Sequence, residues 1–155
     1  AFWLNTNFAL IALGYFILQI AYSTILKHIV ILDVLAVSIG FVLRALGGAV
    51  IIHVKFSGWL LIISFLLALF LGFGKRRHEL VLLEEDGSIH RRILKKYSGY
   101  FLDQLIGVVT PAVVLSYMLY VISPEVTERM GTENLYFTTS FVIYGIFRYL
   151  YLIHH

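Results

Sequence analysis

The residues best suited to chemistry in this sequence form a short cationic run, Gly74-Lys75-Arg76-Arg77-His78-Glu79-Leu80. On a helix, Lys75 and Arg76 lie one turn before Glu79, so the three side chains can share a face. Arginine binds phosphate oxygens through paired N–H groups, and lysine adds a point charge. Glu79 offers one oxygen to a Mg²⁺ ion that bridges a diphosphate. One carboxylate is a poor Mg²⁺ site, so the pattern predicts a second acidic cluster elsewhere.

The same run also has a purely structural interpretation. The stretch 74–97 holds seven of the twelve Lys and Arg residues of the chain. Lys and Arg gather on the cytoplasmic side of membrane spans, where they fix the orientation of the protein. The run is therefore either a phosphate site or an anchor, and the sequence alone leaves both open.

Four further residues stand out near or within apolar stretches. Asp33 and Arg44 lie inside one apolar run, where ionisable side chains are costly and usually face the protein interior or a wet cavity. Eleven residues apart, they fall about 20° apart around a helix but about 16 Å apart along it, so each needs another partner. Tyr22 and Lys27 are either interfacial anchors or part of the same site.

The composition decides the environment of these side chains. Hydrophobic residues make up 60% of the chain and charged residues 14%, with a mean hydropathy of +0.89. Soluble domains are about 45–50% apolar and about 25% charged. The sequence therefore predicts an all-α, polytopic transmembrane bundle. It contains no cysteine, which excludes disulfides and thiolate chemistry. Nucleic acid is not an expected partner, because the basic stretch lies between two predicted spans.

Five spans are expected from the apolar stretches. They are residues 8–22, 29–52, 59–73, 101–122 and 135–153. Between the third and fourth spans, 84–88 reads as a turn, flanked by short helices at 75–83 and 89–96. Residues 123–134 read as a polar loop. The whole chain, 1–155, is expected to be one membrane domain and an internal piece of a longer protein.

Two features of the fourth predicted span, residues 101–122, concern its start and its middle. Asp103 and Gln104 are expected to cap its first turn, and Pro111 to kink it.

Basic residues favour the cytoplasm. Placing 74–100 there also places Lys27 and Arg148 inside, and the acidic 123–134 loop outside. The prediction is a multi-pass protein of the cell (inner) membrane with a cytoplasmic active face.

Several motifs together resemble a known family. They are Tyr22-Ser23…Leu26-Lys27, Asp33-Val34, Gly40-Phe41-Val42-Leu43-Arg44-Ala45, the run 74–80, Tyr97, and Tyr144-Gly145…Phe147-Arg148-Tyr149-Leu150. The chain resembles the UbiA-type prenyltransferase superfamily, in its decaprenyl-phosphate phosphoribosyltransferase branch. That resemblance implies nine transmembrane helices around a cavity open to the cytoplasm, of which this chain would supply the fourth to eighth. The family's first aspartate-rich motif is absent here, and the basic run occupies the place of the second.

The resemblance also implies a reaction and roles for the residues. A polyprenyl (decaprenyl) phosphate would attack 5-phosphoribosyl 1-diphosphate and release diphosphate, with Mg²⁺ as cofactor. The product would be a pentosyl donor for cell-envelope polysaccharide. The implied catalytic residues are Lys75, Arg76, Glu79 and Asp33, with Glu79 as the metal ligand. The implied substrate-binding residues are Tyr22, Lys27, Arg44, Arg77 and Tyr97.

Two other functions stay open at this point. One is a UbiA-type aromatic prenyltransferase that uses a polyprenyl diphosphate, although the missing second aspartate motif speaks against it. The other is a non-enzymatic transporter subunit or scaffold, because intramembrane charges occur in transporters too. A homo-oligomer is also open. A fragment without the upstream acidic motif is expected to be inactive.

Overall fold

A computed structural model describes residues 6–54, 57–86, 98–132 and 134–154, and these residues contain helices and turns but no strand. This confirms the all-α fold. In chain order the helices are α1 (Thr6–Thr24), η1 (Leu26–His28), α2 (Leu32–Ile51), α3 (Gly58–Asp86), α4 (Gly99–Val121), α5 (Pro124–Met130), η3 (Asn134–Phe137) and α6 (Thr138–His154).

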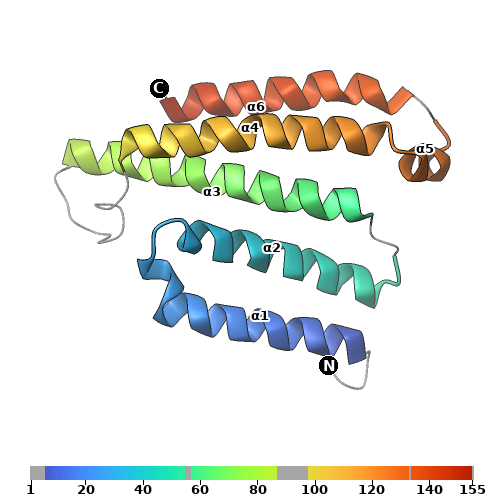
Figure 1. The fold of residues 1–155 in the computed structure, drawn as a ribbon, viewed down its shortest axis with the longest axis horizontal. Helices are drawn as coiled ribbons and strands as arrows, with labels where there is room; N and C mark the ends of the chain where they lie inside the picture. Colours follow the sequence, from blue (N-terminus) through green and yellow to red (C-terminus); the bar gives the residue numbers. More distant parts are fainter. Residues whose placement is uncertain (1–5, 55–56, 87–97, 133, 155) are drawn as a thin grey trace.

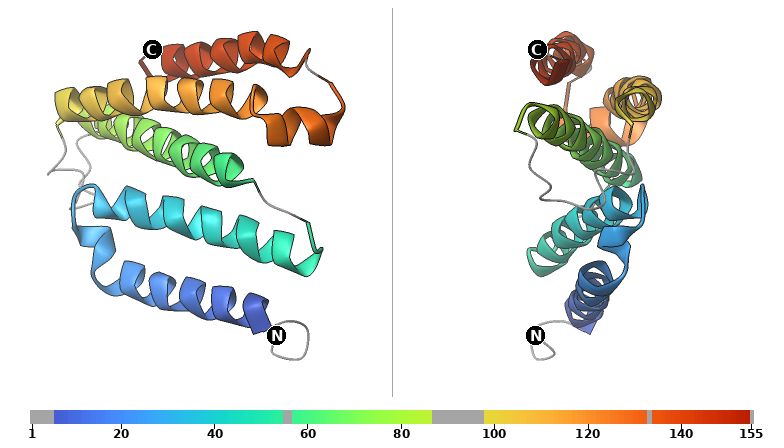
Figure 2. Two further views of the ribbon diagram at one scale, coloured as in Figure 1. Left: turned by 45° about the vertical axis from the view of Figure 1, so that its right-hand side comes forward. Right: turned by 90° about the vertical axis from the view of Figure 1, so that its left-hand side faces the viewer.

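The long helices lie side by side and alternate in direction (Figures 1 and 2). α1 packs on α2, and α2 packs on α3. α4 and α6 both pack on α3 and on each other. Among the described elements, α3 is therefore the only long helix that contacts three other long helices. The core joins α2, α3, α4 and α6 through fully buried side chains such as Val34, Phe70 and Leu102. α3 is thus the central element.

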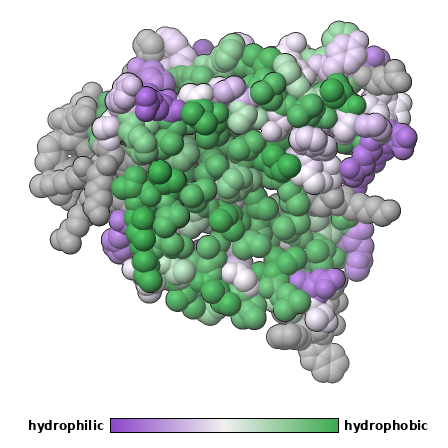
Figure 3. Space-filling model, in the orientation of Figure 1, coloured by the Kyte–Doolittle hydropathy of each residue, from purple (hydrophilic) through white to green (hydrophobic). Residues whose placement is uncertain are grey.

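Among the described residues, four helices, α1 to α4, are long and apolar enough to cross a membrane. α6, which corresponds to the fifth predicted span, has 17 residues. The apolar surface forms a broad area across the middle of the molecule, and polar residues gather toward its two ends (Figure 3). The protein is therefore a multi-pass membrane protein.

The alternating directions bring most of the described basic residues to one end. η1, the C-terminal part of α3, the start of α4 and the end of α6 all lie at this end, which we call the basic end (Figure 1). The end of α2, the start of α3 and α5 lie at the opposite end. Lys27 and Lys75 are therefore on the same side of the bundle, as the loop charges predicted.

The basic run is part of a long helix, which corrects the predicted boundaries. α3 continues without a break from Gly58 to Asp86, so 75–83 is not a separate helix and Glu84–Asp86 is not a turn. From Lys75 to Asp86 the sequence has no Gly or Pro and is rich in good helix formers. The predicted helix at 89–96 and the candidate residue Tyr97 lie outside the described residues.

Two more boundaries differ from the sequence prediction. α2 begins at Leu32 rather than at residue 29, because Ile31 has a φ of 71° and a residue with a positive φ cannot belong to a right-handed helix. The predicted loop 123–134 contains α5, which starts with Pro124 and is capped at its C-terminal end by Gly131, with a φ of 64°. Proline at the start and left-handed glycine at the end are ordinary helix boundary signals.

The start of α4 also corrects a predicted role. The N-cap is Ser98, whose hydroxyl accepts a hydrogen bond from the backbone N–H of Phe101 at 3.1 Å. Asp103 lies beyond the first turn and does not cap the helix. α4 then continues through Pro111 as a single helix. The carboxylate of Asp103 is therefore available for a contact between helices.

Two glycines allow α3 to approach its neighbours closely. A Cβ at Gly72 would lie 2.5 Å from Cγ1 of Val34 in α2. A Cβ at Gly74 would lie 2.6 Å from the hydroxyl of Tyr149 in α6. Atoms cannot approach so closely, so both positions require glycine, which has no side chain. They set the distance of α3 from α2 on one side and from α6 on the other, immediately before the basic run.

Candidate functional site

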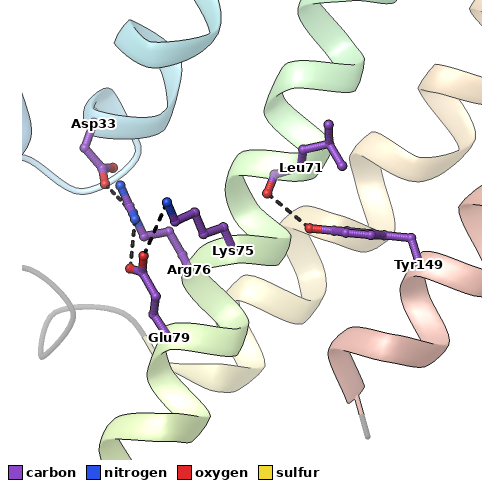
Figure 4. Close-up of polar contacts among 6 residues, drawn as sticks. All are labelled: Asp33, Leu71, Lys75, Arg76, Glu79 and Tyr149. Atoms are coloured by element: carbon purple, nitrogen blue, oxygen red, sulfur yellow. Dashed lines mark hydrogen bonds and ion pairs between the residues drawn. The ribbon is translucent and has the colours of Figure 1, made fainter.

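Arg76 joins two acidic side chains at the basic end. Its Nε donates to Oδ2 of Asp33 at 2.9 Å, and its Nη1 donates to Oε2 of Glu79 at 2.9 Å (Figure 4). Arg76 is 6% exposed and Asp33 is 1% exposed. The three residues, which we call the Arg76 cluster, connect the start of α2 to α3.

Local structure explains how the cluster assembles. Asp33 lies in the first turn of α2, where a negative charge interacts favourably with the helix dipole. Arg76 and Glu79 are three residues apart on α3 and so lie on neighbouring turns of one face. The close contact of Gly72 with Val34 brings α2 within reach of Arg76. The sequence analysis predicted that Asp33 needs a partner other than Arg44, and the structure confirms it.

Lys75 differs from Arg76 in its surroundings. Its side chain is 73% exposed, and its Nζ lies 4.0 Å from Oε1 of Glu79. Glu79 is 24% exposed and therefore lies between a buried guanidinium and an exposed ammonium. The cation of the run that remains open to a ligand at the surface is Lys75. The placement of Arg76 favours a structural role over the phosphate contact that the motif predicted.

The residues in place do not form a complete metal site. Among the described residues, no group of three His, Cys, Asp or Glu side chains is close enough to hold a metal ion. Mg²⁺ prefers octahedral oxygen coordination, whereas Asp33 and Glu79 are both engaged by Arg76. Glu79 fits the role of a single Mg²⁺ ligand at most. That further acidic residues complete a metal site stays a prediction.

Arg77 points to a different neighbour. Its Nε donates to Oδ1 of Asp103 in α4 at 2.9 Å, and Nε2 of His154 in α6 lies 3.2 Å from the same oxygen. We call these three residues the Asp103 cluster. The sequence analysis missed it, because it treated Asp103 as a cap and assigned no role to His154. A usable signal was present, since Arg77 and Asp103 lie at the facing ends of consecutive antiparallel helices.

Arg44 is separate from both clusters. Its guanidinium lies 5.7 Å from the ring centroid of Tyr15 and 5.9 Å from that of Phe41, and its Nε donates to the carbonyl of Gly40 at 3.3 Å. It borders a cleft of about 210 Å³ between α1 and α2. Arg44 is exposed in this chain, so the prediction of an interior position is confirmed for Asp33 and not for Arg44.

Tyr22 and Lys27 lie at the basic end but apart from the Arg76 cluster. Tyr22 is half-buried near the end of α1, and Lys27 is exposed in η1. Within the described part of the chain, the structure shows no polar contact between either residue and that cluster. Their role in substrate binding stays a prediction.

Comparison with known proteins identifies relatives. The chain is 35% identical over 132 residues to a decaprenyl-phosphate phosphoribosyltransferase of Mycolicibacterium smegmatis, covering 85% of this chain and 42% of the relative. It is 33% identical over 146 residues to that of Mycobacterium tuberculosis, covering 94% and 47%. It is 36% identical over 106 residues to that of Corynebacterium glutamicum, covering 68% and 32%. No protein-family model matches the chain.

The chain is a homologue of the decaprenyl-phosphate phosphoribosyltransferases. This confirms the family branch that the motifs indicated. The chain spans less than half the length of these curated relatives. In the longest of these matches the similarity covers 94% of the chain, so it includes α3 and its basic run.

Proposed function

We propose that this chain forms the phosphate-handling end of a membrane enzyme that transfers phosphoribose from 5-phosphoribosyl 1-diphosphate to a polyprenyl phosphate. The main support is the similarity to decaprenyl-phosphate phosphoribosyltransferases over 94% of the chain. The polar residues of α3 fit the chemistry, because an exposed lysine lies beside a carboxylate at one end of an apolar bundle. Lipid phosphates present their headgroups at this level of a membrane.

The reaction needs little proton transfer from the protein. An oxygen of the lipid phosphate forms a bond to the anomeric carbon of the ribose, and the bond from that carbon to the diphosphate oxygen breaks. The nucleophile is already anionic, so no general base is required. The leaving diphosphate gains negative charge in the transition state, and a fixed cation stabilises it. We assign that role to Lys75, whose ammonium is exposed.

Arg76 acts indirectly in this proposal. It holds Glu79 at 2.9 Å and Asp33 at 2.9 Å, and so fixes the carboxylate beside Lys75. A Mg²⁺ ion would supply further charge neutralisation for the diphosphate, with Glu79 giving one oxygen and the other ligands lying outside the described residues. We retain Arg77, Tyr22, Lys27, Arg44 and Tyr97 as proposed substrate-binding residues.

The location follows from the charge distribution. Basic loops favour the cytoplasm, so we place the basic end at the cytoplasmic face of the cell membrane, where a water-soluble sugar diphosphate is available. The product, a lipid-linked phosphopentose, would serve as a pentosyl donor for cell-envelope polysaccharide.

Radiolabelled donors test the proposal in membranes that contain the full-length protein. We expect label transfer from 5-phosphoribosyl 1-diphosphate to polyprenyl phosphate, and no transfer from a prenyl diphosphate to an aromatic acceptor. Glu79→Gln keeps the size of the side chain but removes its charge, so the rate should fall by about tenfold or more. Glu128→Gln is the matched control, because this exposed residue lies in α5 at the opposite end. Activity with the prenyl donor alone would refute the proposal.

A further inference from the structure

A cleft between α3 and α6 has no role in the function proposed above. Its volume is about 420 Å³, and its lining includes Leu67 and Leu71 of α3, Val142 of α6 and Val113 of α4. Ligand pockets in proteins usually have volumes of roughly 300–1,000 Å³. These four side chains are apolar and belong to apolar helices of a membrane protein, so the cleft suits a hydrocarbon chain rather than a sugar.

Gly145 keeps the α6 side of this cleft open. It lines the cleft and is exposed, and a Cβ added there would have no atom within 4 Å. Gly72 and Gly74 are different, because neighbouring side chains occupy the space beside them. A glycine inside a helix destabilises it relative to alanine, and no close contact requires one at Gly145. What this glycine provides is the open space itself.

Tyr149 fixes the register of α6 against α3. Its hydroxyl donates to the carbonyl oxygen of Leu71 at 3.4 Å and lies against Gly74 (Figure 4). Both helices run toward the basic end (Figure 1). When two parallel helices touch, the residue after the contact on one helix and the residue before it on the other project to the same side, because successive residues point about 100° apart. Lys75 follows Gly74 and Arg148 precedes Tyr149, so these two cations share a side.

The same count places the cleft on the side of the two cations. Leu71 is three residues before Gly74, and Gly145 is four residues before Tyr149, so both turn toward that side. Arg77 turns to the other side, where it contacts α4. The cleft is therefore open on the side that α4 does not cover, and the cations lie where it approaches the basic end.

Arg148 is a cation without a protein partner in the part of the chain that the structure describes. Its side chain is exposed, and no hydrogen bond or ion pair joins it to another described residue. The guanidinium binds phosphate oxygens through paired N–H groups. An apolar cleft with an arginine at one end is complementary to a ligand with an anionic head and an apolar chain.

We propose that Arg148 and the α3–α6 cleft form the subsite for the acceptor lipid. Arg148 binds the phosphate of the polyprenyl phosphate, and the cleft holds the isoprene units next to that phosphate. This inference rests on the proposed function. An oxygen of the phosphate at Arg148 forms the bond to the anomeric carbon, while the bond from that carbon to the diphosphate breaks and the diphosphate leaves toward Lys75. The two cations thus divide the acceptor and the leaving group between them.

Photolabelling tests the subsite without any need for activity. The probe is a polyprenyl phosphate with a diazirine on the isoprene unit nearest the phosphate, added to the full-length protein in lipid nanodiscs. We expect label on peptides that contain residues 63–71 or 142–149. Unlabelled polyprenyl phosphate should compete with the probe, and an equal excess of phosphatidylglycerol should not. Equal competition by both lipids would identify a site for bulk phospholipid, and label confined to residues outside this chain would mean that another segment covers the cleft. Either result would overturn the proposal.

Gly145→Leu fills the cleft and should lower the labelling at least about fivefold, because a side chain would occupy the space of the isoprenoid. Its unfolding temperature should not fall, since no atom lies within 4 Å of the added Cβ. Gly107→Leu is the matched control, because Gly107 is also an exposed helical glycine with free space around it but lies in α4 and does not line the cleft. Equal labelling of Gly145→Leu and the wild type would overturn the assignment of the cleft.

Transfer kinetics test the role of Arg148. Arg148→Gln should raise the KM for polyprenyl phosphate by about ten- to a hundredfold and leave the KM for 5-phosphoribosyl 1-diphosphate unchanged. Arg148→Lys keeps the charge and should recover part of the loss. Arg129→Gln in α5, at the opposite end of the bundle, is the control. An Arg148 that only anchors the helix in the membrane would alter neither KM, and this result would overturn its assignment. A wild type that is labelled in the cleft but transfers no phosphoribose would refute the proposed function and leave the lipid subsite standing.

Discussion

Two arginines that are adjacent in the sequence occupy opposite surroundings. Arg76 turns toward α2, is 6% exposed, and contacts a carboxylate that is 1% exposed. Arg77 turns toward α4 and contacts Asp103, whose side chain is 38% exposed. Successive residues on a helix point about 100° apart, so one helix can present a cation to each neighbour. The Arg76–Asp33 pair is buried, and the Arg77–Asp103 pair is open to water.

The difference in exposure gives the clusters different functions. In a dry environment, breaking an ion pair leaves a charge without solvent, which costs several kcal/mol. At an exposed site, water replaces the lost partner and the cost is small. The Arg76 cluster therefore stabilises the α2–α3 interface, whereas the contacts of the Asp103 cluster can be lost at little cost in stability.

Arg76→Met is expected to have the largest effect on stability. It keeps most of the side-chain volume but leaves Asp33 buried without its guanidinium, so the free energy of unfolding should fall by about 3–5 kcal/mol. Thermal unfolding in detergent measures the change. The double variant Asp33→Asn with Arg76→Met should be more stable than the single one, because both charges are gone. Equal destabilisation by Arg76→Met and Arg77→Met would contradict the distinction between the clusters.

The sequence predicted the fold well because its signal is strong at the scale of a whole helix. Apolar stretches identified every long helix, and loop charges predicted which ends lie together. The errors lie where tertiary contacts decide local structure. Glu84–Asp86 reads as a turn from composition, yet α3 continues to Asp86. The positive φ of Ile31, which sets the start of α2, has no sequence signal at all.

The site was predicted less completely, because a residue type does not reveal its orientation. The basic run and Asp33 stood out by their chemistry, and the structure joins Asp33 to the run through Arg76. The sequence does not show that Arg76 points inward and Lys75 outward, since both are ordinary cations one position apart. Arg44 and Asp33 both belong to α2, yet Arg44 contacts the ring of Tyr15 in α1 while Asp33 contacts Arg76 in α3.

Substitution of the two close-contact glycines should have the next largest effect. A methyl group at Gly72 would meet Val34 at 2.5 Å, and one at Gly74 would meet Tyr149 at 2.6 Å. Each alanine variant should lose about 1–3 kcal/mol through overpacking. Val34→Ala should recover part of the loss in Gly72→Ala but none of that in Gly74→Ala.

Gly107→Ala is the matched control for these two variants. It is a helical glycine with no atom within 4 Å of the added Cβ, so alanine should be neutral or stabilise by up to about 1 kcal/mol. Unfolding temperatures of the three alanine variants provide the comparison. A loss at Gly107 similar to that at Gly72 would mean that the close contacts of α3 are not the cause.

Arg77→Met should cost less than either glycine variant, and its cost should depend on salt. The pair with Asp103 is partly exposed, so we expect a loss of about 0.5–1 kcal/mol at low ionic strength. At about 1 M salt the Debye length is about 3 Å, and most of this difference should disappear. The loss in Arg76→Met should persist, because salt does not reach a buried pair. Unfolding measured across a salt series distinguishes the two, and a salt-sensitive Arg76 would show that its cluster is wet.

Among substitutions of the exposed cations of α3, Lys75→Ala is expected to have the smallest effect on stability and the largest effect on activity. The ammonium is 73% exposed and lies 4.0 Å from Glu79, a distance at which a surface pair contributes about 0.5 kcal/mol or less. A charge-assisted contact to a phosphate is worth about 1.5–3 kcal/mol, so phosphoribosyl transfer should fall roughly ten- to a hundredfold. Lys75→Arg should retain part of the activity, because it keeps the charge.

His78→Ala is the control for Lys75, since His78 is an exposed neighbour on the same helix. Transfer is measured per folded molecule at matched protein levels in membranes. If the basic run were only a membrane anchor, Lys75→Ala would lower insertion and leave the rate per molecule unchanged. A rate that falls equally in Lys75→Ala and His78→Ala would show general disturbance of this part of α3. A selective fall in Lys75→Ala, with an unchanged unfolding temperature, is the result that separates a ligand-binding cation from the buried arginine beside it.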